Sequence, residues 1–109
     1  MFNPHSSESD LMKSLLEPLL DDFQYWFGRS RQLLEAEVIP FLAPEQQADL
    51  LARVITAQQE VATAQMLLRA TGGQVGIETA VLAPWHHLVT ECWQIAIKFR
   101  LQESTEKGM

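Results

Sequence analysis

Hydrophobic residues recur along most of the chain at the three- and four-residue spacing of one helix face. The first such run spans 11–38, and Ser9 or Asp10 precedes it as an N-cap residue. Pro18 lies on the outward side, so we expect this helix to bend there and not to break. At about 100° per residue, the apolar side chains share one arc: Met12, Leu15, Leu16, Leu19, Leu20, Phe23, Trp26, Phe27, Leu33 and Leu34.

Two further helices are predicted, with boundaries set by proline and glycine. Pro44 suits the first position of a helix over 44–71, which Gly72-Gly73 ends. After a loop over 74–83, Pro84 opens a third helix that continues to about residue 102. No strand pattern is present. We therefore expect an all-α fold, an antiparallel three-helix bundle in which the first two helices form a long hairpin and the third is shorter. The single domain would cover 10–102, between flexible tails at 1–9 and 103–109.

The second helix carries two apolar columns, so we expect it to contact both other helices. Gln47, Gln58 and Gln65 lie between these columns. We interpret their amides as hydrogen-bonding one another or the backbone, which would fix the register of the helices. The alternative is that the amides line a ligand site.

Helix length predicts which apolar surface stays uncovered. At about 1.5 Å per residue, the first two helices are each about 40 Å long and the third is under roughly 30 Å. The third helix would start beside Leu11 and Leu68 and run toward Phe27, short of the turn between the first two. We expect an uncovered patch at this tip, where a partner or a second copy would bind: Leu33, Leu34, Ile39, Phe41, Leu50, Leu51 and Ile55.

Two more groups of residues are candidates for partner contacts. On the third helix, His86, Trp93 and Ile97 form a stripe beside the core face. This stripe either seals the bundle or docks a partner through an aromatic anchor. On the first helix, Tyr25 and Arg29 belong to an exposed column, which is either an ordinary solvated face or a recognition site.

Few residues are suited to catalysis or to metal binding. His86, His87, Glu91 and Cys92 are close in sequence, but only His87 and Glu91 share a face. A bound metal normally needs three or four converging ligands, so no metal site is predicted. Cys92 falls on the core face and should be a buried, unreactive thiol. With no nucleophile–base pair, we expect neither catalytic activity nor a cofactor.

The charge balance restricts the partner. The chain has 14 acidic and 8 basic residues and a net charge of −6. Nucleic acids and anionic membranes are bound through Lys and Arg, so we expect neither as a partner. No run approaches the roughly 20 apolar residues that span a bilayer. No signal peptide is recognisable, and the single cysteine fits a reducing compartment, so a cytoplasmic location is expected.

Three segments together carry a resemblance to a known family. They are EPLLDDFQYWFGRSR at 17–31, PEQQADLLARV at 44–54 and PWHHLVTECWQ at 84–94. The chain resembles a family of short cyanobacterial proteins classed as a domain of unknown function, and the likeness covers most of 17–99. The resemblance implies a cyanobacterial cytoplasm and a setting near the photosynthetic machinery. It implies no activity and no catalytic residues.

Two functions are compatible with the sequence. The first is a small adaptor protein without catalytic activity, which binds a protein partner or itself through the hairpin tip. The alternative is a bundle that binds an apolar ligand or pigment near Trp26, Trp85, Trp93 and Gln58, because helical bundles form such sites from facing side chains.

Overall fold

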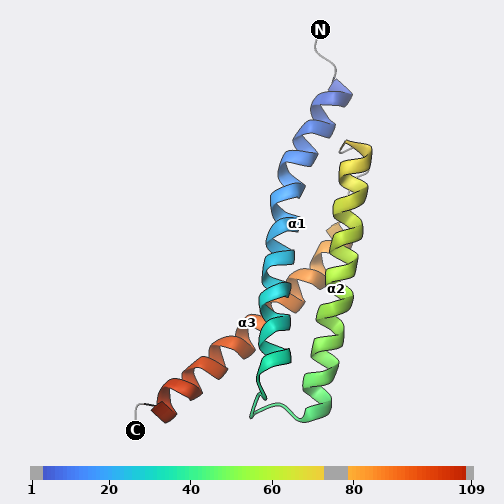
Figure 1. Cartoon of the computed structure of the whole chain (residues 1–109). Helices are drawn as coiled ribbons and strands as arrows, with labels where there is room; N and C mark the ends of the chain where they lie inside the picture. Colours follow the sequence, from blue (N-terminus) through green and yellow to red (C-terminus); the bar gives the residue numbers. More distant parts are fainter. Residues whose placement is uncertain (1–3, 73–78, 108–109) are drawn as a thin grey trace.

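Three α-helices make up nearly all of the chain that the computed structural model describes, residues 4–72 and 79–107 (Figure 1). They are α1 (Pro4–Ala36), α2 (Pro44–Thr71) and α3 (Thr79–Lys107). The all-α, three-helix fold class is therefore confirmed. No helix in these two ranges is long and apolar enough to cross a membrane.

The hairpin of α1 and α2 carries most of the core. The two helices lie side by side and antiparallel, joined by a tip loop at residues 37–43 (Figure 1). Side chains that recur every third or fourth residue point inward from both helices, and Leu20, Phe27, Val54 and Val61 are fully buried. As predicted, α1 continues through Pro18, whose exposed position leaves the lost hydrogen bond on the solvent side.

The helix ends differ from the prediction in three places. The first helix begins at Pro4 and not near residue 11, because no glycine or proline interrupts the segment between them. The third begins at Thr79, so Pro84 lies inside it on an exposed face. It has 29 residues against 28 in α2, so the expectation of a shorter third helix is wrong. Helical structure thus extends into both segments expected as tails, while 74–78 of the expected loop lies outside the described residues.

The predicted end of the second helix is confirmed. Gly72 adopts a left-handed conformation with φ of 62°, and its N–H is directed at the carbonyls of Leu68 and Arg69. A residue with a Cβ would be strained at this angle, so glycine suits this C-cap. At the other end, Gln46 Oε1 accepts a hydrogen bond from the N–H of Ala43 at 2.8 Å.

Gln47 closes the hairpin tip. Its Oε1 accepts the N–H of Ile39 at 3.0 Å, and its Nε2 donates to the carbonyls of Leu34 at 2.9 Å and Glu37 at 2.7 Å. These carbonyls lie where α1 ends and have no intrahelical partner, so the amide satisfies them in place of water. One side chain of α2 thereby fixes the path of the chain out of α1.

The other two glutamines join α1 to α2 along the hairpin. Gln24 Nε2 donates to the carbonyl of Gln58 at 3.0 Å and lies 3.4 Å from Gln65 Oε1. Gln65 Nε2 donates to Asp21 at 2.8 Å, and Arg31 donates to Gln58 Oε1 at 3.1 Å. The interpretation that these amides bind one another or the backbone is confirmed for Gln47, which binds the backbone, whereas the side chains of Gln58 and Gln65 bind other side chains, those of Arg31, Gln24 and Asp21. Their partners belong to the chain itself, which is the arrangement expected of groups that set helix register.

The third helix crosses the tip half of the hairpin obliquely and then extends beyond it (Figure 1). Near its start, the ring of Trp85 packs edge-on against Phe23, with centroids 5.6 Å apart. Four turns later, Lys98 Nζ lies 4.4 Å from the ring centroid of Phe41, beside the tip, and Phe99 is buried. The third helix therefore reaches the tip, which its predicted position did not allow.

This crossing overturns the expectation of an uncovered tip. Leu34, Ile39 and Leu50 are buried, and Leu33, Phe41 and Leu51 are partly buried against the same core. Ile55 is likewise only partly exposed. The cause is the position of α3, which begins part of the way along the hairpin and crosses toward the tip. At the tip, Val38 is exposed. Other large exposed apolar side chains lie at the opposite end of the hairpin: Leu11, Met12, Leu15, Leu19, Met66 and Leu67.

Candidate functional site in the cleft between α1 and α3

Three aromatic rings form a continuous surface where α1 and α3 meet. Trp26 of α1 packs edge-on against Trp93 of α3, with centroids 5.1 Å apart, and Tyr25 packs edge-on against Trp26 at 5.0 Å. The exposed fractions of Tyr25, Trp26 and Trp93 are 54%, 36% and 41%. Helix geometry accounts for the position of the two tryptophans, because Trp26 is adjacent to the core residue Phe27 in α1 and Trp93 to the core residue Cys92 in α3. The rings are thus fixed by one another and still reach solvent.

Two arginines lie beside this aromatic surface. Arg29 of α1 donates from Nη1 to the hydroxyl of Tyr25 at 3.2 Å, and its guanidinium carbon lies 5.9 Å from that ring's centroid. Arg100 of α3 lies two turns after Trp93, on the same helix face. Among the ion pairs of the described residues, none includes Arg29 or Arg100. The site therefore carries two positive charges that form no ion pair within the described chain.

The two tryptophans and the two arginines surround an open cleft of about 300 Å³. Trp26, Arg29, Trp93 and Arg100 line it together with Ala96. The same five residues and Ile97 surround an adjoining shallow hollow of about 320 Å³, which no carboxylate lines. Of these two hollows, only the first is lined by carboxylates, those of Glu37 and Glu103. Its other lining residues are Ser30, Leu33, Cys92 and Phe99.

The thiol of Cys92 lies at the base of the cleft. Its side chain is buried, and burial raises the pKa of this thiol above its ordinary value of 9.0. The thiolate is the reactive form of cysteine, and a raised pKa keeps the group protonated at neutral pH. The prediction of a buried thiol is confirmed.

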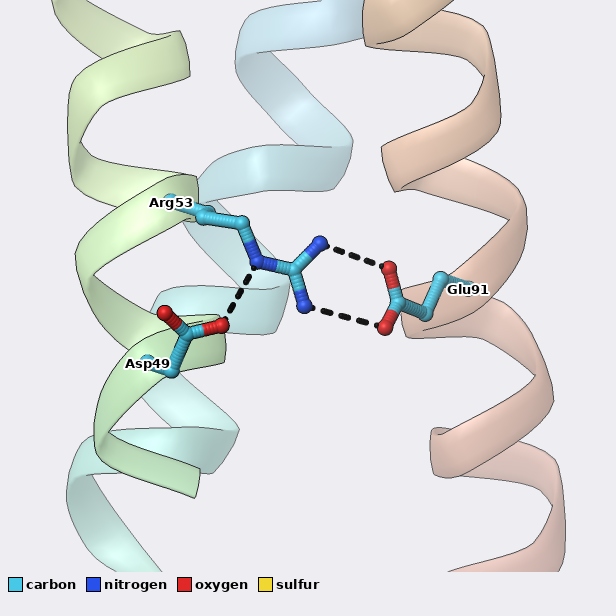
Figure 2. A network of polar contacts seen from close by, with 3 residues as sticks. All are labelled: Asp49, Arg53 and Glu91. Atoms are coloured by element: carbon cyan, nitrogen blue, oxygen red, sulfur yellow. Dashed lines mark hydrogen bonds and ion pairs between the residues drawn. The ribbon is translucent and has the colours of Figure 1, made fainter. Parts of the chain in front are cut away.

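The opposite side of α3 forms a groove with α2 in which Arg53 is paired with carboxylates. Figure 2 shows Arg53 of α2 between two carboxylates. Its guanidinium donates to both oxygens of Glu91 at 2.9 and 3.0 Å and to Asp49 at 3.0 Å. Nearby, Trp85 Nε1 donates to Glu60 at 3.1 Å. These hydrogen bonds link α3 to α2, and the guanidinium of Arg53 is fully engaged by the two carboxylates.

We expect acid to weaken the attachment of α3 to α2. Hydrogen bonds from Arg53 hold the pKa of Glu91 below its ordinary value of 4.5. A carboxyl with a lower pKa in the folded chain stabilises the fold above its unfolded pKa, and the contribution is lost as the pH falls through the folded pKa. The free energy of unfolding should therefore start to fall below pH 4.5, the unfolded value. Urea denaturation followed by circular dichroism, from neutral to acidic pH, measures this dependence.

The matched variants for this measurement are Glu91→Gln and Asp22→Asn. Glu91→Gln removes the titrating partner of Arg53, so its stability should depend less on pH than that of the wild type. Asp22 is exposed and takes part in no ion pair of the described chain, so Asp22→Asn should keep the wild-type dependence. Equal acid sensitivity in the wild type and in Glu91→Gln would show that this pair does not hold α3. The difference should be small, because both partners are about half exposed and solvent screens their attraction.

The structure brings together five of the residues predicted for partner binding. Arg29 and Trp93 line both hollows, Ile97 lines the shallow hollow and Leu33 lines the first cleft. Tyr25 lies beside them, in contact with Trp26 and Arg29. His86 is exposed on α3 but lines neither hollow, and neither do the other six tip residues, of which Leu34, Ile39 and Leu50 are buried in the core.

Sequence reasoning did not assign two residues of this site to partner binding. Trp26 was placed on the core arc of α1 and considered only for the alternative ligand site, although it lies at the edge of that arc. Arg100 was assigned no role. A spacing of seven residues places it on the same face as Trp93, and this is the signal that could have identified it.

The residues considered for ligand or metal binding do not share one site. Trp85 is buried in the core, and Gln58 pairs with Arg31 and Gln24 between α1 and α2, apart from Trp26 and Trp93. Glu91 is held by Arg53. Within the two described ranges, no three His, Cys, Asp or Glu side chains gather in a way that could hold a metal ion.

Comparison with known proteins identifies the family. The chain belongs to the DUF2605 family of proteins of unknown function, whose family model matches residues 6–101 and so includes most of all three helices. The resemblance to a domain of unknown function is therefore confirmed. No curated protein and no solved structure matches the chain.

Proposed function

We propose that this member of the DUF2605 family is an adaptor without catalytic activity, which binds a protein partner through the cleft between α1 and α3. The observation that carries the proposal is the surface of Tyr25, Trp26 and Trp93, which remains substantially exposed beside Arg29 and Arg100. Tyr, Trp and Arg are the residues in which binding energy concentrates at protein interfaces. Exposed rings also place apolar surface in water, which a partner would cover.

The packing of the rings favours binding. Each ring contacts its neighbour edge-on, and Arg29 is held by the hydroxyl of Tyr25. Side chains that are already fixed lose less conformational entropy when a partner covers them, so more of the contact energy contributes to affinity. A partner that inserts one large side chain would therefore meet a surface that is largely formed in advance.

The hairpin tip has no part in this proposal, because Ile39 and Leu50 are buried there. A second copy of the chain is one protein that the cleft could accept, and self-association is tested together with other partners. The absence of catalysis is supported by Cys92, whose protonated thiol is a poor nucleophile. The cytoplasmic location and the setting near the photosynthetic machinery stay predictions.

The proposal is tested by cross-linking in native lysate with wild-type protein, Trp93→Ala and Leu101→Ala, followed by mass spectrometry. Leu101 is a matched control, since it is a large side chain of α3 that is 63% exposed and lines neither the cleft nor the shallow hollow. At least one protein should be captured by the wild type and by Leu101→Ala and lost from Trp93→Ala. With the purified partner, Trp93→Ala should weaken binding about 30-fold, the effect of an interface anchor worth about 2 kcal/mol.

The same proteins are compared by sedimentation. If the partner is a second copy, the wild type and Leu101→Ala should form a dimer that Trp93→Ala does not form. Identical capture and identical mass for all three proteins, each shown to be folded, would contradict the proposal.

A further inference from the structure

We infer that the cleft between α1 and α3 binds an acidic segment of the partner, in which an apolar or aromatic anchor is flanked by Asp or Glu. This inference rests on the proposed function and adds the chemistry of the partner. The anchor lies against Trp26 and Trp93 in the shallow hollow, and the flanking carboxylates bind Arg29 and Arg100.

The cations of the chain differ in whether they form ion pairs. Three of them bind carboxylates within the chain: Lys13 with Glu17, Arg31 with Glu35, and Arg53 with Asp49 and Glu91. The chain has 14 acidic side chains for 8 basic ones, so carboxylates are in excess. Even so, Arg29 and Arg100 take part in none of these pairs, and both line the same hollow.

The guanidinium groups of Arg29 and Arg100 are chemically suited to bind carboxylates. A guanidinium presents several N–H donors in one plane, which match the two oxygens of a carboxylate. Arg29 uses Nη1 for the hydroxyl of Tyr25, which orients its guanidinium without neutralising it. A partner that brings carboxylates to this position therefore gains charge-assisted hydrogen bonds that the chain itself does not supply.

The shallow hollow is small and open to solvent. Pockets that enclose drug-sized molecules measure about 300 to 1,000 Å³. The hollow of about 320 Å³ is at the small end of this range and opens to solvent, with Trp26, Trp93 and Ile97 as its apolar lining. These dimensions suit one large side chain of a partner protein better than an enclosed small molecule.

Two sets of charges oppose an acidic partner, and both have a limited reach. The net charge of −6 repels it, but at physiological salt this repulsion is screened over about 8 Å. Glu37 and Glu103 line the deeper cleft but not the shallow hollow. Glu37 and Glu103 also fix the orientation of the bound segment, because its acidic flank must lie over Arg29 and Arg100 and away from these two carboxylates.

The inference is tested by selecting a displayed library of random peptides against the purified wild-type protein. Selected peptides should carry an apolar or aromatic residue with Asp or Glu nearby. Their affinity should fall about threefold for Arg29→Gln or Arg100→Gln and about tenfold for both together, as expected for partly exposed charge-assisted contacts. Affinity should also fall as salt is added.

Arg69→Gln is the matched control, because Arg69 is an exposed arginine of α2 that takes part in no ion pair of the described chain. It removes the same charge at a distance from the cleft and should bind the selected peptides like the wild type. The reversed variant, Arg29→Glu with Arg100→Glu, should select anchors flanked by Lys or Arg.

The outcomes separate this inference from the proposed function. Peptides that require Trp93 but show no enrichment of Asp or Glu would overturn the inference and leave the binding role of the cleft in place. An equal loss of affinity in Arg69→Gln would also overturn it, because net charge would then be the cause. Peptides that bind Trp93→Ala as well as the wild type would contradict both.

Discussion

Phe27→Ala is expected to lower the free energy of unfolding by about 3 to 5 kcal/mol, the usual cost of truncating a buried phenylalanine. Phe27 is fully buried, and its ring stacks on Phe23 with centroids 6.0 Å apart. Removing the ring loses apolar burial and leaves a cavity that the helices fill only in part. Small domains have about 5 to 15 kcal/mol of stability in total, so this single change removes a large share of it. Urea denaturation followed by circular dichroism gives the value.

Two further variants make the result interpretable. Leu101→Ala removes an exposed apolar side chain, and its stability should stay within about 0.5 kcal/mol of the wild type. Phe27→Leu keeps most of the apolar volume and should lower the free energy of unfolding less than Phe27→Ala does. The loss of stability therefore remains measurable in Phe27→Leu if the alanine variant is unfolded. If Phe27→Ala were as stable as Leu101→Ala, the core would not be centred where α1 meets α2 and α3.

Ile39→Ala is expected to destabilise the protein by about 2 to 5 kcal/mol without removing an interaction surface. Ile39 lies in the tip loop and is fully buried, and its N–H donates to Gln47 Oε1. Its side chain belongs to the core beneath the point where Gln47 fixes the chain. Urea denaturation measures the stability, and sedimentation of the folded protein measures its mass.

Val38→Ala is a matched control one residue away. Val38 is 83% exposed, so its truncation should change the stability by less than about 0.5 kcal/mol. If Ile39→Ala kept the wild-type stability and changed only the mass or the capture of a partner, the tip would be an interface.

Hydrophobic periodicity predicted the core face of α1 only in part. The single arc drawn from the sequence includes Leu20 and Phe27, which are buried, but also Leu15 and Trp26, which are exposed. An arc of this width faces two neighbours, and the sequence of α1 does not say along how much of its length each neighbour extends. The crossing of α3 decides this, and it leaves Trp26 at the edge of a cleft.

The partners of charged residues were the least predictable feature. Glu91 was considered from the sequence as a metal ligand, yet its carboxylate accepts hydrogen bonds from Nη1 and Nη2 of Arg53 on α2. Contacts between residues 38 positions apart depend on the alignment of two helices, and no local pattern encodes them. The same holds for the cleft, in which Arg29 and Arg100 come from different helices.

The sequence by itself determined the features that depend on near neighbours along the chain. These are the three helices, the end of α2 at Gly72 and the passage of α1 through Pro18. The tertiary structure alone decided where α3 crosses the hairpin, which apolar residues it covers and which cations stay unpaired. Helix formation and capping are local interactions, whereas a crossing is set by the packing of side chains far apart in sequence.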